Sequence, residues 1–139
     1  MNKVQKTYAI AKSHYEACEE SLKEYERAWI VKNGVKRLDG SVPNSLWQLC
    51  LDEEESMFLD YSERLDNDEG FWKLMQDKRT AYQLLHDAEE ALIDYGLSIA
   101  PAGIREILDR NRCQAKTREK LLDLTFRLDP RTVKTSRKH

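Results

Sequence analysis

An unbroken heptad spacing of apolar residues runs through the first thirty residues of the chain. Alternate steps of four and three residues connect Val4, Tyr8, Ala11, Tyr15, Cys18, Leu22, Tyr25 and Trp29. Lys, Glu, Ser and Gln fill most of the positions between them. A 3.5-residue repeat places these side chains on one narrow stripe, so the pattern predicts a long amphipathic helix over residues 2–32. The stripe is completed either within the chain or by a second copy, and spacing alone leaves both open.

The pair Asn33-Gly34 follows this predicted helix and has two interpretations. Glycine readily adopts the left-handed conformation that ends many helices, and Val35 stands where an apolar contact often accompanies such a cap. The same pair is also typical of a tight β-hairpin turn. We favour the helix cap, because the sequence offers few strand-forming residues.

Two further stretches repeat the heptad spacing. The second predicted helix begins at Pro43 or Asn44, and its stripe consists of Trp47, Leu51, Glu54, Phe58, Tyr61 and Leu65. The third covers residues 68–95, with a stripe of Phe71, Leu74, Lys78, Ala81, Leu85, Ala88, Leu92 and Tyr95 that Lys78 interrupts. Asp66 and Glu69 have the spacing of a capping box before this helix, and Gly96 is placed to end it.

The remaining sequence predicts two short helices, one beginning at Pro101 or Ala102 and one over residues 116–128. The expected fold is therefore all-α: a long antiparallel three-helix bundle, coiled-coil-like, plus two short C-terminal helices. Three long helices with short connections pack most simply in up-down-up order. We expect the bundle over residues 1–97, the short helix pair packed on or beside it over 98–130, and a basic, mobile tail over 131–139.

The formal net charge of −2 conceals an asymmetry along the chain. Residues 1–104 contain 12 Lys and Arg against 20 Asp and Glu, whereas residues 105–139 contain 11 against 5. A basic end on an acidic body favours a partner for that end, either nucleic acid or an acidic protein surface. A solvated tail accounts for the same composition.

The class of protein is bounded by what the sequence lacks. No stretch approaches the about 20 apolar residues that span a bilayer, so we expect no membrane association. The first six residues lead into no apolar core, so no secretory signal is expected. Cys18, Cys50 and Cys113 are far apart and odd in number, which is typical of reduced thiols in a cytoplasmic protein.

Signatures of common active sites are also missing. Di-iron helical bundles need Glu-x-x-His on two helices, and the sequence contains none. The run Asp66-x-Asp68-x-Gly70 departs from the calcium-loop spacing, which places Gly sixth and Glu twelfth. No glycine-rich phosphate loop is present. We therefore expect a non-enzymatic protein with no catalytic residue, metal, cofactor or small-molecule substrate.

Two sets of charged residues are candidate binding sites for a macromolecule. Salt-dependent phosphate contacts need clustered cations, and the C-terminal segment supplies Arg105, Arg110, Arg112, Lys116, Arg118, Arg131, Lys134, Arg137 and Lys138. Interleaved acidic residues at helical spacing allow some of these to pair along the surface instead. An acidic helical surface can also mimic nucleic acid toward a basic partner, and this alternative uses Asp52, Glu53, Glu55, Asp66, Asp68 and Glu69.

Two segments resemble the small terminase subunits of tailed phages. The first is a tyrosine-rich helix, Tyr15 to Tyr25, followed by the loop Val31-Lys32-Asn33-Gly34-Val35-Lys36 and a helix beginning at Pro43-Asn44. The second is Asp94-Tyr95-Gly96-Leu97-Ser98, followed by Pro101 and Ile104-Arg105-Glu106-Ile107-Leu108. In that family a helix ends in Gly-Leu-Thr-Pro and a short Arg-bearing helix follows, whereas here Ile99-Ala100 intervenes and an extra helix is inserted. Together the segments cover about half of the chain.

The resemblance implies an oligomeric, DNA-recognising packaging protein whose tail contacts the motor subunit. Combined with the charge pattern, it predicts a non-enzymatic oligomer that associates with nucleic acid through its basic C-terminal segment. The alternative is a protein–protein interaction module, an adaptor or inhibitor, that uses its acidic bundle surface against a basic partner. In either case we expect a protein partner or self-association.

Overall fold

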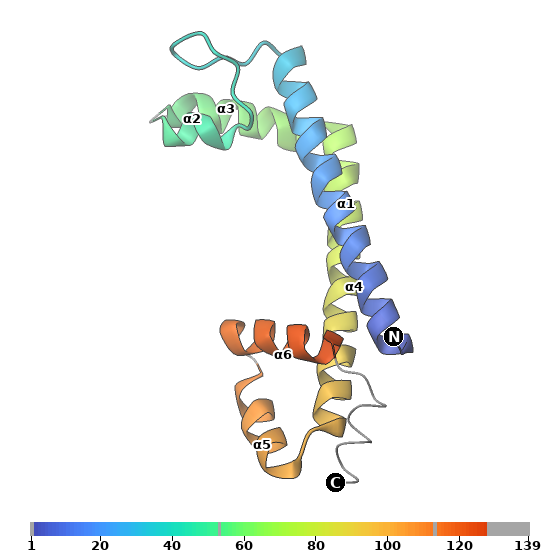
Figure 1. Ribbon diagram of the computed structural model, residues 1–139. Helices are drawn as coiled ribbons and strands as arrows, with labels where there is room; N and C mark the ends of the chain where they lie inside the picture. The colour runs from blue at the N-terminus through green and yellow to red at the C-terminus, as the bar shows by residue number, and fades with distance from the viewer. Residues whose placement is uncertain (1, 53, 113, 128–139) are drawn as a thin grey trace. The chain divides into compact units, whose positions relative to one another are not determined.

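The computed structural model describes residues 2–52, 54–112 and 114–127, and within them all regular structure is helical (Figure 1). The helices are α1 (Lys3–Lys32), α2 (Trp47–Leu51), α3 (Glu55–Asp66), α4 (Glu69–Ile99), α5 (Ala102–Asn111) and α6 (Ala115–Arg127). The two long helices, α1 and α4, pack together. The all-α prediction is therefore confirmed.

The chain divides into two compact units of opposite charge. We call His14–Tyr82 the acidic unit, because it contains 9 Lys and Arg against 16 Asp and Glu. We call Met1–Ser13 with Gln83–His139 the basic unit, because it contains 14 against 9. The division falls inside α1 and α4, whereas the sequence predicted the boundary at residue 97.

Within the acidic unit, α1 and α4 run antiparallel. The ring of Tyr25 lies 6.2 Å from that of Phe71 near the start of α4, and the ring of Tyr15 lies 5.9 Å from that of Tyr82 further along. Three full-length helices in up-down-up order would instead make the first and third helices parallel. The order differs because the chain does not form one long second helix before it enters α4.

Helix α1 ends as expected, with Gly34 in the left-handed conformation (φ 66°). The Val35 N–H donates to the carbonyl of Ile30, and the Gly34 N–H donates to that of Val31, which is the paired bonding of a Schellman cap. Val35 is fully buried. The cap is thus confirmed over the hairpin, and it turns the chain into the core of the acidic unit. That core consists of Trp29, Ile30, Val35, Leu46, Leu49 and Leu65.

The predicted second helix is divided into α2 and α3. The interruption lies where the loop after α1 contacts the chain: the Arg37 guanidinium donates to both carboxylate oxygens of Asp52, at 2.7 and 3.0 Å. The Leu38 N–H also donates to Glu54 Oε1 at 3.2 Å. These contacts stabilise a break that a heptad pattern does not reveal, and they bury Glu54 to 9% exposure.

Both predicted capping residues of the third helix are corrected, although its predicted start at residue 68 lies within one residue of Glu69. Asp68, and not Asp66, caps α4, because its carboxylate accepts the Phe71 N–H at 3.0 Å and its carbonyl accepts the Trp72 N–H. Gly96 does not end α4, which continues to Ile99. A Cβ at Gly96 would lie 1.8 Å from Thr125 Cγ2, so this glycine permits close approach of α6 instead.

Among the described residues of the basic unit, Ile93, Leu97 and Leu121 form an apolar cluster. Asn2 and Gln5 form a reciprocal capping box at the start of α1, each side-chain oxygen accepting the other residue's backbone N–H. The side-chain amide nitrogen of Gln5, Nε2, donates to the backbone carbonyls of Thr125 and Phe126, at 3.1 and 2.8 Å. One buried glutamine therefore connects the beginning of α1 to the last turn of α6.

Candidate functional site

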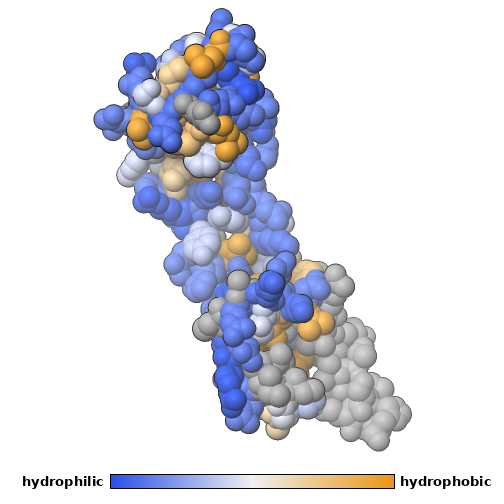
Figure 2. Space-filling view, turned by 90° about the vertical axis from the view of Figure 1, so that its left-hand side faces the viewer, coloured by the Kyte–Doolittle hydropathy of each residue, from blue (hydrophilic) through white to orange (hydrophobic). Residues whose placement is uncertain are grey.

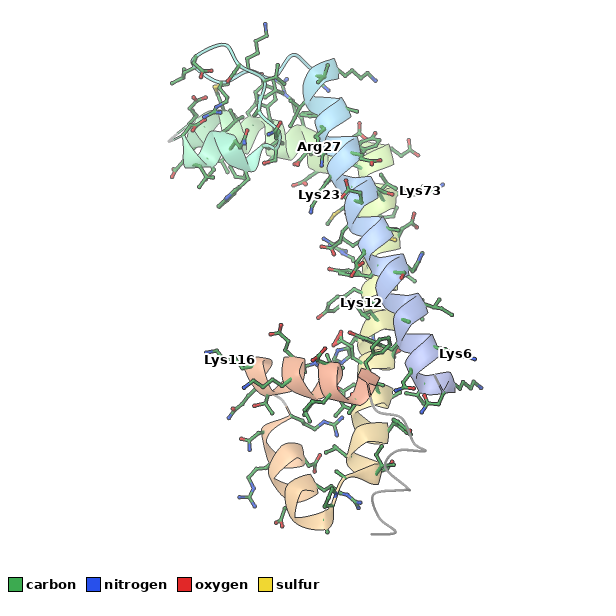
Figure 3. All side chains as sticks on the ribbon, in the orientation of Figure 1. Lys6, Lys12, Lys23, Arg27, Lys73 and Lys116 are labelled. Carbon is green, nitrogen blue, oxygen red and sulfur yellow. The ribbon has the colours of Figure 1, made fainter. Side chains whose placement is uncertain are left out.

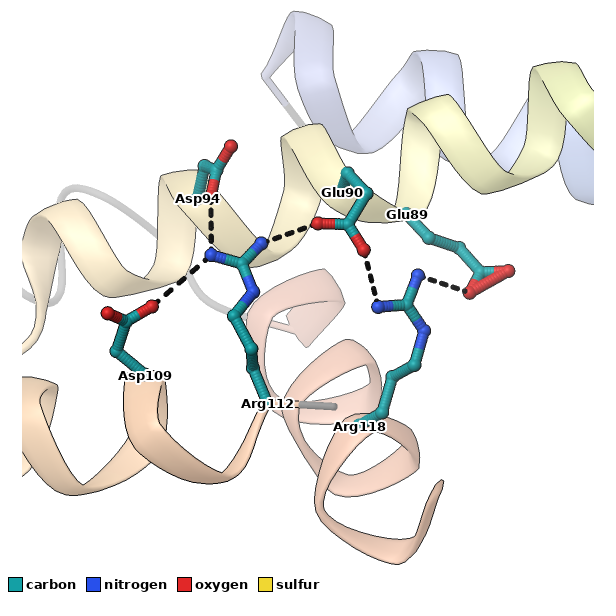
Figure 4. A network of polar contacts seen from close by, with 6 residues as sticks. All are labelled: Glu89, Glu90, Asp94, Asp109, Arg112 and Arg118. Atoms are coloured by element: carbon teal, nitrogen blue, oxygen red, sulfur yellow. Dashed lines mark hydrogen bonds and ion pairs between the residues drawn. The ribbon is translucent and has the colours of Figure 1, made fainter. Parts of the chain in front are cut away.

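The strongest polar cluster in the described residues holds two of the arginines expected to contact nucleic acid (Figure 4). Arg112 binds Glu90 at 2.6 Å, Asp94 at 3.0 Å and Asp109 at 3.3 Å. Arg118 binds the other oxygen of Glu90 at 2.6 Å and Glu89 at 3.3 Å. Glu90 therefore bridges both guanidinium groups.

The two arginine side chains are each only 21% exposed. The hydrogen bond from Arg118, assisted by the charges of both arginines, lowers the pKa of Glu90 below its ordinary value. Charge-assisted bonds of this kind fix orientation as well as adding stability. Arg112 and Arg118 thus fasten the α5–α6 segment to α4, a contact inside the basic unit that sequence spacing did not predict.

The remaining candidates for nucleic-acid contact are dispersed. Arg105 donates to the carbonyls of Ser98 and Ala100 at the end of α4, and Arg110 pairs with Glu106 on the surface of α5 at 3.4 Å. Lys116 is exposed on the first turn of α6 (Figure 3). The other four, Arg131, Lys134, Arg137 and Lys138, lie outside the described residues.

The acidic alternative set is also divided between structural and exposed positions. Asp52 pairs with Arg37. Asp68 accepts hydrogen bonds from the Tyr25 hydroxyl and the Phe71 N–H. Both bonds lower the pKa of Asp68, and the bond from Tyr25 has the larger effect. The exposed members are Glu55, Asp66 and Glu69. Glu53 lies outside the described residues.

An exposed apolar surface on the acidic unit was not predicted. We define the α2 patch as Leu38, Val42, Trp47 and Leu51, which are between 50% and 83% exposed. The heptad stripe predicted that Trp47 and Leu51 face the core, but Leu46 and Leu49 are buried in their place. The sequence signal for this arrangement is the three-residue step between Leu46 and Leu49, which places these two leucines on a different helical stripe from Trp47 and Leu51.

Hydrogen bonds hold the loop that carries Leu38 against the residues that follow α2. The Arg37–Asp52 pair and the Leu38 N–H···Glu54 bond hold the loop beside the end of α2, which brings Leu38 and Leu51 to the same part of the surface. The Arg37 N–H donates to the Ser41 carbonyl at 2.8 Å and closes the loop. The Trp47 ring rests with its edge against Phe58, at 5.9 Å. Figure 2 shows several hydrophobic side chains exposed among hydrophilic ones over the part of the molecule that contains α2 and α3.

Metal centres and membrane-spanning helices are not found in the described part of the chain. No three His, Cys, Asp or Glu side chains there are grouped as metal ligands would be. No helix among the described residues combines the length and apolar character needed to cross a membrane.

No family model, no curated protein and no solved structure matches this chain.

Proposed function

We propose that this chain is a non-enzymatic protein-interaction module whose α2 patch binds a partner protein. The observation that carries the proposal is the exposure of Trp47 and Leu51 one helical turn apart, together with exposed Leu38 and Val42 in the preceding loop. Exposed apolar groups that cluster, unlike single ones, mark protein interfaces. Tryptophan in particular is enriched among the residues that dominate binding energy.

The charge around the patch indicates the chemistry of the partner. The acidic unit has a net charge of −7. Exposed Asp39 and Glu55 stand next to the patch in sequence, and Arg37 is already engaged with Asp52. Complementary potentials steer association and select partners. The partner surface should therefore present apolar side chains surrounded by Lys and Arg, which retains the basic-partner alternative drawn from the sequence.

The test compares two leucines of similar exposure in the two units. Leu51 is 66% exposed in the acidic unit, and Leu124 is 60% exposed in the basic unit. Proteins captured by the intact chain are identified at low and moderate salt, and capture is repeated with Leu51→Asp and with Leu124→Asp. A basic protein that is lost with Leu51→Asp and retained with Leu124→Asp supports the proposal. Identical capture by both variants contradicts it.

A second candidate function is association with nucleic acid through the basic unit. The net charge of +5 on that unit favours it, and an oligomeric DNA-packaging subunit is the specific form that the terminase resemblance implies. Because Arg112 and Arg118 are committed to ion pairs, the contacts to phosphate would come from Arg105, Arg110 and Lys116 together with the four basic residues after position 130.

Titration of the chain into labelled duplex and single-stranded DNA tests this second function. Each phosphate contact that is lost should lower the dependence of affinity on salt. Replacing Lys116, Arg131, Lys134, Arg137 and Lys138 by Gln should therefore weaken binding and flatten its salt dependence. Unchanged affinity after these replacements would refute this function without bearing on the α2 patch.

A further inference from the structure

Lys78 is the one residue that interrupts the apolar heptad stripe of α4, and neither function above uses it. Its side chain is partly buried on α4, and its ammonium group lies 5.9 Å from the centroid of the Tyr15 ring on α1. A lysine at a heptad core position packs less apolar surface than a leucine would, although its aliphatic stem can still cover some. The position therefore needs an explanation beyond the packing of two helices.

A shallow cavity of about 220 Å³, wide open to solvent, lies beside Lys78. Its lining consists of Tyr15 from α1 and of Met75, Lys78, Arg79 and Tyr82 from α4. The four α4 residues follow helical spacing, so they share one face. The rings of Tyr15 and Tyr82 stand 5.9 Å apart and are inclined at 59°. The volume is below that of pockets for drug-sized ligands, so the cavity encloses only part of a ligand.

The lining combines two kinds of chemistry. Tyr82 contacts the Tyr15 ring and is 56% exposed, so part of its side chain is accessible to the ring of a ligand. Met75 adds a polarizable contact to a ring edge. Lys78 and Arg79 supply two positive charges beside the rings, which suits an anion attached to the stacked group. Stacking faces beside cations are the means by which proteins hold single nucleotides without reading their sequence.

We propose that this cavity binds a nucleotide, with the base stacked on Tyr82 and the phosphate held by Lys78 and Arg79. A free nucleoside monophosphate and one residue of a single strand share this chemistry. Burial raises the pKa of the Tyr15 hydroxyl, and the negative charge of Glu19 raises it further. Glu19 should therefore oppose an anion bound beside Tyr15. The cavity is separate from the α2 patch, so loss of either function leaves the other intact.

The experiment uses the full chain at low salt and measures binding of AMP, adenosine, inorganic phosphate and a single-stranded octanucleotide by calorimetry. AMP should bind more tightly than adenosine or phosphate. Tyr82→Ala should weaken AMP binding at least about fivefold, as expected for a lost stacking contact, whereas Tyr82→Phe should retain it. Glu19→Gln should strengthen it.

A matched pair of lysines on α4 provides the control. Lys78→Gln should abolish the preference for AMP over adenosine, and Lys73→Gln, an exposed lysine on the same helix that does not line the cavity (Figure 3), should leave it unchanged. An octanucleotide that binds far more tightly than AMP, and depends equally on Tyr82, identifies the source as a strand. Comparable affinities identify it as a free nucleotide. Absence of AMP binding, or binding that survives both Tyr82→Ala and Lys78→Gln, would overturn the proposal.

Discussion

The acidic and basic units contain segments of the same two long helices, yet different forces complete each unit. In the acidic unit, a core of six apolar residues packs α2 and α3 against the ends of α1 and α4. In the described part of the basic unit, the cluster of Ile93, Leu97 and Leu121 is joined by the Arg112 and Arg118 ion pairs and by the Gln5 bridge. The comparison teaches that ion pairs and a buried glutamine hold the described helices of the basic unit, whereas apolar packing dominates the unit that carries the α2 patch.

The largest effect should come from the core of the acidic unit. Leu49 is fully buried, so Leu49→Ala should lower the free energy of unfolding by about 2–5 kcal/mol through lost burial and a residual cavity. Urea denaturation followed by tryptophan fluorescence measures it. Leu59→Ala, at a leucine that is 64% exposed on α3, is the control and should have little effect. Equal losses for the two variants would contradict the assigned core.

A smaller loss should follow from filling the contact between α4 and α6. Gly96→Ala places a methyl group 1.8 Å from Thr125 Cγ2. The overpacking should cost about 1–3 kcal/mol, which outweighs the gain of about 1 kcal/mol in helix propensity. Thr125→Ser removes the clashing methyl group, so the double variant should recover most of the loss. A stabilised Gly96→Ala single variant would mean that α6 does not approach α4 at this point.

The ion pairs should contribute less than either packing contact. Arg118→Gln should cost about 1.5–2 kcal/mol, the low end of the range for hydrogen bonds to charged groups, because the side chain is not fully buried. The surface pair Arg64–Asp60, at 3.2 Å, should contribute well below 1 kcal/mol. Thermal denaturation at 0.1 and 1 M salt distinguishes them. The difference between Arg118→Gln and the intact chain should shrink at high salt, and a difference that salt leaves unchanged would point to packing instead.

Acid should weaken the same cluster. Because the pKa of Glu90 is lower in the folded chain, its carboxylate stabilises the fold above the unfolded pKa of about 4.5 and loses that contribution as the pH falls through the folded value. The intact chain should therefore lose more thermal stability between pH 6 and pH 3 than Glu90→Gln does. Parallel pH profiles for the two proteins would exclude Glu90 from the stabilising network.

The α2 patch should have the smallest effect on stability. Leu51→Asp changes an exposed side chain that the core does not use, so the free energy of unfolding should shift by less than about 0.5 kcal/mol. Circular dichroism during denaturation measures this. A large loss would place Leu51 in the core and would remove the argument for a binding surface.

Local features of the fold could be predicted from the sequence. The heptad spacing located α1 and α4 to within a few residues, and Asn33-Gly34 located the cap of α1, because both depend on neighbours along the chain. The break between α2 and α3 depends on Arg37 and Leu38, which reach it from a preceding loop. The prediction that Gly96 ends a helix was wrong, because Thr125, whose close approach requires a glycine at this position, lies 29 residues later in the chain.

The candidate sites were harder to predict, for a related reason. Composition identified the basic end, but it could not reveal that Glu89, Glu90 and Asp94 on α4 engage Arg112 and Arg118. Likewise, Trp47 and Leu51 fit a heptad stripe, and only the tertiary burial of Leu46 and Leu49 leaves them exposed. Charge and hydropathy patterns name candidate residues, whereas partners distant in sequence decide which of them remain accessible.

Amide hydrogen exchange of the intact chain at 0.1 and 1 M salt tests the contrast between the two units most directly. Screening weakens ion pairs and leaves apolar burial largely intact. The amides of α5 and α6 should therefore exchange faster at high salt, while those of Ile30, Val35 and Leu49 in the acidic unit should keep their protection. Equal acceleration in both units, or none in α5 and α6, would contradict the assignment of different stabilising forces to the two units.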